Sequence, residues 1–227
     1  MYTRSQIKKA GKTLREKSSA SKQDLVDAEN ALTYWRTIHG KVMTDFYEIV
    51  KAEVEKINSK AVVVQRLKRC PSIAAKLNRY TETQLTTMQD IAGIRAIMKD
   101  MKEVELLREC LKKYAQIHEF KTYDNYITDP KTSGYRSIHL IFRYKDKNDP
   151  ERNGLLIEIQ LRTELQHSWA TAVETMGAFV GANFKFGEGQ QKWLKYFALT
   201  SNAFSFIEET PQVPGYRNLS KEILTRI

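Results

Sequence analysis

The sequence of 227 residues contains only two cysteines, Cys70 and Cys110, and they lie far apart along the chain. Two distant thiols cannot form a disulfide framework or supply a zinc site, so we expect a reducing, cytoplasmic setting. The longest apolar runs, such as residues 61–64, are far too short to cross a bilayer. The polar N-terminus also lacks the apolar stretch of a signal peptide, so the sequence predicts no contact with a membrane.

Internal repeats, low-complexity segments and long interdomain linkers are also absent from the sequence. With 41% hydrophobic and 28% charged residues, the composition is that of a globular protein that buries a substantial core. The formal net charge of +10 favours polyanionic partners such as nucleotides or nucleic acids, although solubility accounts for part of this excess.

Two strand-like stretches carry most of the candidate chemistry. Residues 155–163 alternate apolar side chains with a row of polar ones, namely Glu158, Gln160 and Arg162. Residues 131–139 follow a turn and place Tyr135 and His139 on one face of a strand. If the two strands are neighbours in one sheet, a phenol, an imidazole and a carboxylate meet on one surface. That combination indicates a binding or catalytic site.

A basic segment precedes these stretches and contains Arg66, Lys68, Arg69, Lys76 and Arg79. Pro71 interrupts it, and Ser72 is a plausible N-cap for a short helix that carries Lys76 and Arg79 on one face. A bound triphosphate needs several cations of this kind, because its anionic oxygens must be neutralised together. A solvated basic surface explains the same residues equally well.

Residues 88–98 read as a buried strand with Asp90 at its entry and Gly93 where a ligand or another backbone comes close. Arg95 lies inside this apolar run and needs a partner or a phosphate to offset its desolvation. A carboxylate at a strand end is a natural Mg²⁺ ligand, although a turn or helix cap uses aspartate in the same way.

The remaining pattern is mostly helical. We expect residues 1–21 to form a frayed helix or an arm, and residues 24–39 and 42–57 to form a helical hairpin broken at Gly40, whose aromatic residues lie in the core. Further helices are predicted at 103–114, 164–176 and 188–208, and a strand at 118–123. A last helix is expected from Ser220, and the sequence stops early in it, as a fragment of a longer protein would.

The predicted fold is an α+β domain with a small mixed β-sheet flanked by helices. It divides into an N-terminal helical region (1–58), a core (59–180) and C-terminal helices packed on that core (181–227).

In order and spacing, the motifs resemble the synthetase domain of the RelA/SpoT family of alarmone synthetases over about residues 60–175. The matching residues are Arg66-Leu-Lys68, Ser72-Ile, Lys76-Leu, Asp90-Ile-Ala-Gly-Ile-Arg95, Tyr126-Ile, Pro130-Lys131, Gly134-Tyr-Arg-Ser-Ile-His139 and Glu158-Ile-Gln-Leu-Arg-Thr163. The resemblance implies a nucleotidyltransferase-like fold. It also implies transfer of the β,γ-pyrophosphate of ATP to the ribose 3′-hydroxyl of GDP or GTP, which makes (p)ppGpp and AMP.

The resemblance further implies roles for the matched residues. The ATP phosphates would be held by Arg66, Lys68, Lys76, Arg79 and Arg95. Asp90 would bind Mg²⁺, and Glu158 would complete the metal site or accept the proton of the attacking hydroxyl. The acceptor side would consist of Lys131, Tyr135, His139, Gln160 and Arg162. In that set, Tyr135 would stack on the acceptor base, Lys131 and His139 would lie near its phosphates, and the other two would hold the surrounding network.

Two departures from the family pattern shape the expected function. No His-Asp dipeptide occurs, so the family's hydrolase activity is not expected. Residues 165–174, Leu-Gln-His-Ser-Trp-Ala-Thr-Ala-Val-Glu, resemble instead a branch of toxic small synthetases, some of which modify the 3′ end of tRNA or adenosine nucleotides. The acceptor therefore stays open between guanosine nucleotides, adenosine nucleotides and tRNA. The partners implied by short family members are an antitoxin protein or further copies in a homo-oligomer.

A third reading is a basic RNA-binding or regulatory module that kept the fold without the activity. The presence of both Asp90 and Glu158 argues against this reading, because a binding module needs neither carboxylate.

Overall fold

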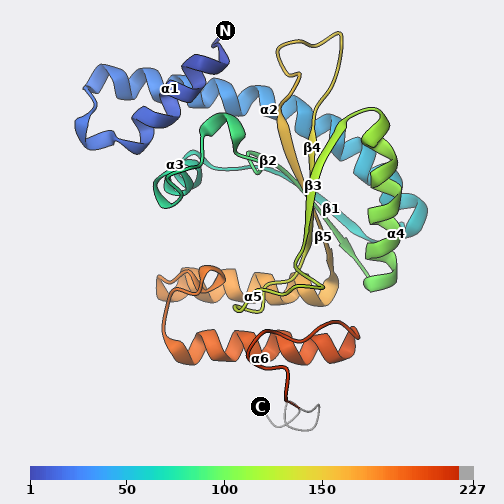
Figure 1. The fold of residues 1–227 in the computed structure, drawn as a ribbon. Helices are drawn as coiled ribbons and strands as arrows, with labels where there is room; N and C mark the ends of the chain where they lie inside the picture. The colour runs from blue at the N-terminus through green and yellow to red at the C-terminus, as the bar shows by residue number, and fades with distance from the viewer. Residues whose placement is uncertain (220–227) are drawn as a thin grey trace.

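A computed structural model describes residues 1–219 of the chain (Figure 1). The strands are β1 (Val62–Leu67), β2 (Ala92–Met98), β3 (Glu119–Asn125), β4 (Ile138–Arg143) and β5 (Leu156–Thr163). The helices are α1 (Arg4–Arg15), α2 (Lys22–Ile57), α3 (Cys70–Arg79), α4 (Met101–Lys112), α5 (Glu164–Val180) and α6 (Gln191–Ile207). Short 3₁₀ turns join some of them, including η2 (Leu85–Thr87) and η4 (Phe184–Phe186). The helix predicted from Ser220 lies outside the described residues.

The strands form one mixed sheet in the order β1-β2-β5-β4-β3. Strands β2 and β5 are parallel, and the other neighbours are antiparallel. The condition set for the two strand-like stretches is met, because β4 pairs with β5 and places His139 opposite Gln160. The predicted α+β class with a small mixed sheet is confirmed as well.

Helices α2 and α4 cover one face of the sheet (Figure 1). The apolar residues of β5 point to this side: Ile157, Ile159 and Leu161 are completely buried in the same core as Phe46 of α2 and Leu107 of α4. The alternation predicted for β5 is therefore confirmed. Helices α5 and α6 lie side by side beyond one end of the strands, and part of the second sheet face is left open between α3 and α5.

The N-terminal segment is ordered, and its prediction as a frayed helix or arm is wrong. Helix α1 begins with a capping box in which Thr3 and Gln6 satisfy each other's backbone N–H groups. Ile7 and Leu14 are buried against the rest of the core. The apolar positions lie among so many lysines that their helical spacing was hard to recognise in the sequence.

The predicted hairpin with a break at Gly40 is also wrong, because α2 is one helix of 36 residues. A glycine inside a helix costs about 1 kcal/mol relative to alanine, which continuous packing on both sides offsets. Ile38 and Val42 are both buried on either side of Gly40. A Cβ atom at Gly40 would lie 3.6 Å from Leu67 Cδ1, so the helix passes close to β1 at this point.

Two boundaries differ from the prediction. Helix α3 begins at Cys70 with Arg69 as its N-cap, and Pro71 lies in the first turn, where its missing N–H is not needed. Strand β4 begins at Ile138, so Tyr135 precedes it in a buried, irregular segment and does not lie on a strand face. In the described part of the chain, no helix combines the length and apolar character needed to span a membrane.

Candidate active site

The open face of the sheet carries two rows of polar side chains. In one row, Arg66 of β1 is paired with Gly93 of β2, which is paired with Glu158 of β5. In the next row, Arg95 is paired with Gln160, which is paired with His139. Cross-strand partners point to the same face, so these side chains share one surface. Gly93 has no side chain, which leaves space between the guanidinium of Arg66 and the carboxylate of Glu158.

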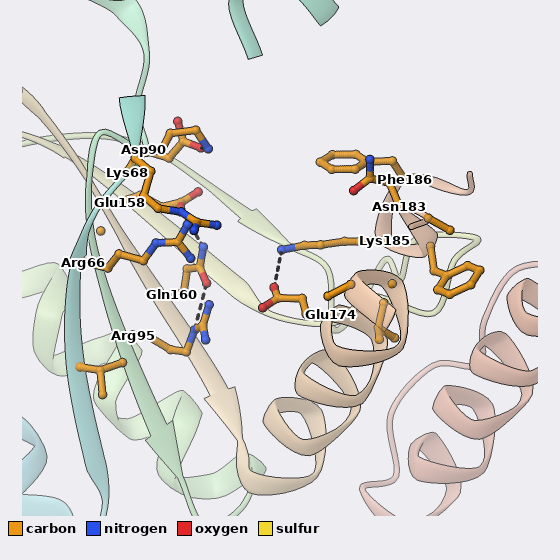
Figure 2. Close-up of a pocket in the computed structure, with 18 of the residues that line it drawn as sticks. Arg66, Lys68, Asp90, Arg95, Glu158, Gln160, Glu174, Asn183, Lys185 and Phe186 are labelled. Atoms are coloured by element: carbon orange, nitrogen blue, oxygen red, sulfur yellow. Dashed lines mark hydrogen bonds and ion pairs between the residues drawn. The ribbon is translucent and has the colours of Figure 1, made fainter. Parts of the chain in front are cut away.

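A cleft of about 610 Å³ lies between this surface and the C-terminal end of α5 (Figure 2). Its sheet side is lined by Arg66, Lys68, Arg69, Asp90, Arg95, Glu158 and Gln160. Its opposite side is formed by the last turns of α5 and the segment 181–186 that follows. The cleft is large enough for a nucleotide and is strongly charged along the sheet.

Asp90 lies at one end of the cleft, in the turn that leads into β2. Its carboxylate accepts from two ammonium groups, with 2.9 Å to Lys68 Nζ and 2.9 Å to Lys76 Nζ. Lys68 follows β1 and Lys76 lies on α3, so three separate segments meet at this carboxylate. All three side chains are partly exposed, at 20–31%.

Arg79 does not join this cluster. Its guanidinium forms an ion pair of 3.2 Å with Glu188 and lies 4.2 Å from the ring centroid of Phe186. It therefore connects α3 to the segment after α5, beside the cleft. Of the cations predicted to hold phosphates, the structure places Arg66, Lys68 and Arg95 in the lining of the cleft, Lys76 at Asp90 and Arg79 next to it.

Glu158 lies deeper and is held by two neutral or weakly basic partners. His139 Nδ1 is 2.9 Å from its Oε1, and Gln160 Nε2 donates to its Oε2 at 2.7 Å. Burial alone raises the pKa of this carboxyl, but the hydrogen bond and charge of His139 outweigh burial and lower the pKa to about 2. Burial alone would lower the pKa of His139, and its bond to Glu158 reverses the direction and raises it. Glu158 is thus ionised at neutral pH.

Tyr135 is connected to the same network and is only 2% exposed. Its hydroxyl accepts from Arg162 Nη2 at 2.7 Å and is 2.7 Å from His139 Nε2. Burial raises the pKa of this phenol, but Arg162, His139 and Lys185 together lower it to about 7. Lys185 Nζ lies 4.8 Å from the centroid of the Tyr135 ring. Stacking of an acceptor base on this ring stays a prediction, and it requires Lys185 to move.

Of the predicted acceptor residues, Gln160 lines the cleft, and Tyr135 and His139 lie behind the lining, against Lys185 and Glu158. The other two, Arg162 and Lys131, lie farther from it. Arg162 is completely buried and reaches the cleft only through Tyr135 and through Gln160 Oε1, which accepts from it at 3.1 Å. Lys131 is exposed, and its Nζ lies 4.3 Å from the ring centroid of Tyr126. Binding of an acceptor by either residue stays a prediction.

The sequence analysis missed the residues that α5 and the segment after it contribute. Glu174 and Lys185 form an ion pair of 3.6 Å on the side of the cleft opposite the sheet, and Asn183 and Phe186 line it as well. Two signals were available: Glu174 ends the unusual run of residues 165–174, and glycines cluster in residues 177–189 as in a loop. Neither signal shows that the loop returns to the sheet.

The donor set of the cleft fits a hard cation. Among residues 1–219, no group of three or more His, Cys, Asp or Glu side chains lies close enough to hold a metal by itself. Asp90 and Glu158 nevertheless line the same cleft, one before β2 and one on the adjacent β5. Mg²⁺ takes one or two carboxylates and completes its shell with water and phosphate oxygens, so this pair suits it when a polyphosphate is bound.

Comparison with known proteins agrees with this arrangement. Residues 65–178 match the family described as a region found in RelA/SpoT proteins. The GTP pyrophosphokinase YjbM of Bacillus subtilis is 35% identical over 113 residues, which are 48% of this chain and 52% of that protein. The GTP pyrophosphokinase YwaC of Bacillus subtilis is 32% identical over 111 residues, which are 47% of this chain and 52% of that protein. The chain thus spans about half the length of these curated relatives.

Solved structures have the same fold. The small alarmone synthetase 1 from Bacillus subtilis, solved bound to its product pppGpp, has a TM-score of 0.60 and 26% identity, covering 74% of this chain and 89% of that one. A GTP pyrophosphokinase family protein from Streptococcus pneumoniae has a TM-score of 0.63 and 23% identity, covering 82% of this chain and 93% of that one.

Proposed function

Because this chain belongs to the RelA/SpoT family, we propose that it transfers the β,γ-pyrophosphate of ATP to the ribose 3′-hydroxyl of GDP or GTP. The products are AMP and a guanosine nucleotide of the (p)ppGpp type, and without a His-Asp pair the chain acts as a synthetase only. The observation that carries the proposal is the row of Arg66 and Glu158 across Gly93, which places a cation and an ionised carboxylate on one wall of the cleft.

The donor end is suited to a polyphosphate. Within residues 1–219, the ammonium groups of Lys68 and Lys76 are bound only to Asp90, and both are partly exposed, so phosphate oxygens can replace Asp90 as their partner when ATP enters. Arg66 and Arg95 lie on the sheet beside them and add guanidinium donors for the remaining charge. Transfer of this kind depends mainly on positioning and charge neutralisation, which these cations provide.

The acceptor end is suited to hold the nucleophile. The 3′-hydroxyl oxygen forms a bond to the β-phosphorus of ATP while the bond from that phosphorus to the α,β-bridging oxygen breaks and AMP leaves. The hydroxyl proton passes to the carboxylate of Glu158. Burial by itself raises the pKa of this carboxyl, so replacing the bond from His139 with one from the hydroxyl makes Glu158 a stronger base.

Asp90 would hold Mg²⁺, and Glu158 would complete the metal site only through the carboxylate oxygen that does not take the hydroxyl proton. The bound ion would supply further neutralisation of the phosphate charge. In the proposal, Tyr135 and Lys131 receive the acceptor nucleotide, and Gln160 and Arg162 keep Glu158 and Tyr135 in place.

Names of relatives support the guanosine acceptor. YjbM and YwaC are described as GTP pyrophosphokinases, and the structural neighbour from Bacillus subtilis was solved with pppGpp. The test is a transfer assay with γ-³²P-labelled ATP and Mg²⁺, which offers GDP, GTP, AMP, ATP and deacylated tRNA in parallel. Label on GDP or GTP with release of AMP is expected, and absence of label from every guanosine nucleotide contradicts the proposal.

A second acceptor is favoured by two features of the sequence, the net charge of +10 and the variant Trp169-Ala-Thr-Ala. With this charge, the 3′-terminal adenosine of tRNA is a candidate, and the chain would then act as a translation-blocking toxin that needs an antitoxin partner in the cytoplasm. Binding of a polynucleotide releases several counterions, whereas a mononucleotide releases few. Label on tRNA that falls steeply with added salt would establish this acceptor, and a weak salt dependence would favour the nucleotide.

A further inference from the structure

The ammonium group of Lys185 lies between an aromatic ring and a carboxylate. Its Nζ is 4.8 Å from the ring centroid of Tyr135 and 3.6 Å from Oε1 of Glu174. Figure 2 shows this side chain extending from the segment after α5 into the cleft, with Glu174 pointing toward it from α5. The ammonium group of Lys185, a hydrogen-bond donor, therefore covers the face of the Tyr135 ring, and the carboxylate of Glu174, an acceptor, lies next to this ammonium group.

We propose that Lys185 holds the place of the acceptor base and that Glu174 selects this base as guanine over adenine. The inference rests on the proposed function, because that function is what places a purine over Tyr135. It adds Lys185, and it gives a role to Glu174, the last residue of the run 165–174. Glu174 becomes a specificity-determining residue and Lys185 a group that the acceptor displaces.

The chemistry of the two purines explains the selection. Guanine presents N1–H and the 2-amino group side by side, so a carboxylate accepts two parallel hydrogen bonds from it. Adenine presents its 6-amino group beside the lone pair of N1, so the same carboxylate accepts one bond and faces one repulsive contact. Paired contacts of this kind distinguish one base from another by about tenfold or more.

Displacement of Lys185 is feasible because its present bonds are weak. The side chains of Lys185 and Glu174 are 33% and 50% exposed, and ion pairs at such exposure contribute little. The segment that carries Lys185 lies between Gly181 and Gly187, whose φ angles are +67° and +76°. A Cβ atom at either glycine would meet nothing within 4 Å, whereas Phe184 between them is buried in the core, so displacement needs only the partly exposed side chain of Lys185 to move.

The experiment compares equilibrium binding of GDP and ADP, together with transfer to each, for the full chain and its variants. Glu174→Gln keeps the size of the side chain, but its amide group presents a donor beside an acceptor. We expect the preference for GDP over ADP to fall about tenfold. Lys185→Ala removes the competing ammonium and should tighten binding of both nucleotides about threefold without changing the preference, a gain that corresponds to a weak exposed pair.

Matched controls are Glu164→Gln at the exposed start of α5 and Lys192→Ala on α6, neither of which lines the cleft. Both should bind as the wild-type chain does. Glu174→Asp retains the negative charge on a shorter side chain and should keep part of the preference for GDP. If Glu174→Gln loses the preference and Glu174→Asp keeps part of it, the loss is due to the missing charge and not to a change in folding.

The outcomes separate the inference from the proposed function. An unchanged preference in Glu174→Gln, or a wild-type chain that does not prefer GDP, overturns the inference even when transfer proceeds. A preference that Glu174→Gln abolishes, in a chain that transfers nothing, supports the inference and contradicts the proposed activity.

Discussion

The two carboxylates of the cleft have opposite surroundings. Asp90 is bound by two lysine ammonium groups, and all three side chains are partly exposed. Glu158 is bound by an imidazole and an amide that belong to a larger network, and its side chain is only 14% exposed. The network continues through Tyr135 to Arg162, which is completely buried.

The difference shows how one cleft combines an exchangeable end with a rigid end. Lysine side chains rotate freely, and exposed ion pairs contribute about 0–1 kcal/mol each, so the partners of Asp90 can be replaced by phosphates at little cost. In the buried network, each polar group depends on its neighbours, and removal of one leaves another without a partner. Substitutions at the two ends should therefore have different kinetic signatures.

The largest effect is expected for Glu158→Gln, which keeps the shape of the side chain and removes its charge. Loss of the base should reduce kcat about 1,000-fold, while binding of ATP stays nearly unchanged because the cations of the donor end remain. The measurement combines the labelled transfer assay with equilibrium binding of ATP. Turnover near that of the wild-type chain would show that Glu158 is not the base.

A smaller effect is expected for Lys76→Ala at the other end. Loss of one charge-assisted bond to phosphate should raise the KM for ATP about 10-fold to 100-fold, with little change in kcat. Lys68 still binds Asp90 in this variant, so the fold should be retained. Lys60→Ala, an exposed lysine outside the cleft, is the control. A fall in kcat with unchanged KM would mean that the two ends do not differ as described.

Tyr135→Phe tests the rigid end more gently, because it keeps the ring and removes only the hydroxyl shared by His139 and Arg162. We expect kcat to fall about tenfold, the effect of one lost hydrogen bond in a buried network, with the acceptor KM nearly unchanged. Tyr135→Ala also removes the ring and should raise the acceptor KM. Equal effects of the two variants on KM would indicate that the ring does not contact the acceptor.

The smallest effect is on the stability of the fold and concerns His39, a core histidine. Its pKa is lowered, whereas the pKa of His139 is raised. His39 is 1% exposed, its Nδ1 is 2.7 Å from the carbonyl oxygen of Trp35, and burial lowers its pKa to about 4. The unfolded chain takes up a proton from about pH 6.5 downward, whereas the folded chain does not until about pH 4, so stability is lost as pH falls through this window. At pH 5.5 the loss should be about 1 kcal/mol.

Urea unfolding at pH 7 and pH 5.5 measures this loss, and His39→Gln provides the comparison. The variant cannot be protonated at this position, so its stability should change less between the two pH values than that of the wild-type chain. An equal change in both proteins would assign the pH dependence to other groups.

Local patterns were sufficient to predict which side chains of β5 lie on the polar face of the sheet. Alternation in residues 155–163 separated Glu158 and Gln160 from the buried Ile157 and Ile159, since a strand turns successive side chains to opposite faces. The entry position of Asp90 and the cations of the basic segment were also recognisable, because each depends on a few neighbouring residues. Where long-range packing competed with a local signal, the prediction failed, as at Gly40 inside α2.

The sequence by itself therefore determined the α+β class and the family to which the chain belongs, whereas the pairing of β4 with β5 came from the structure. Only the tertiary structure decided that Arg162 is buried, that Tyr135 lies in the segment before β4 beneath Lys185, and that Glu174 meets this lysine on the side of the cleft opposite the sheet. The physical reason is the range of the interactions. Periodicity and strand-end chemistry are encoded in adjacent residues, whereas these contacts depend on how α5 and the segment after it pack against the sheet.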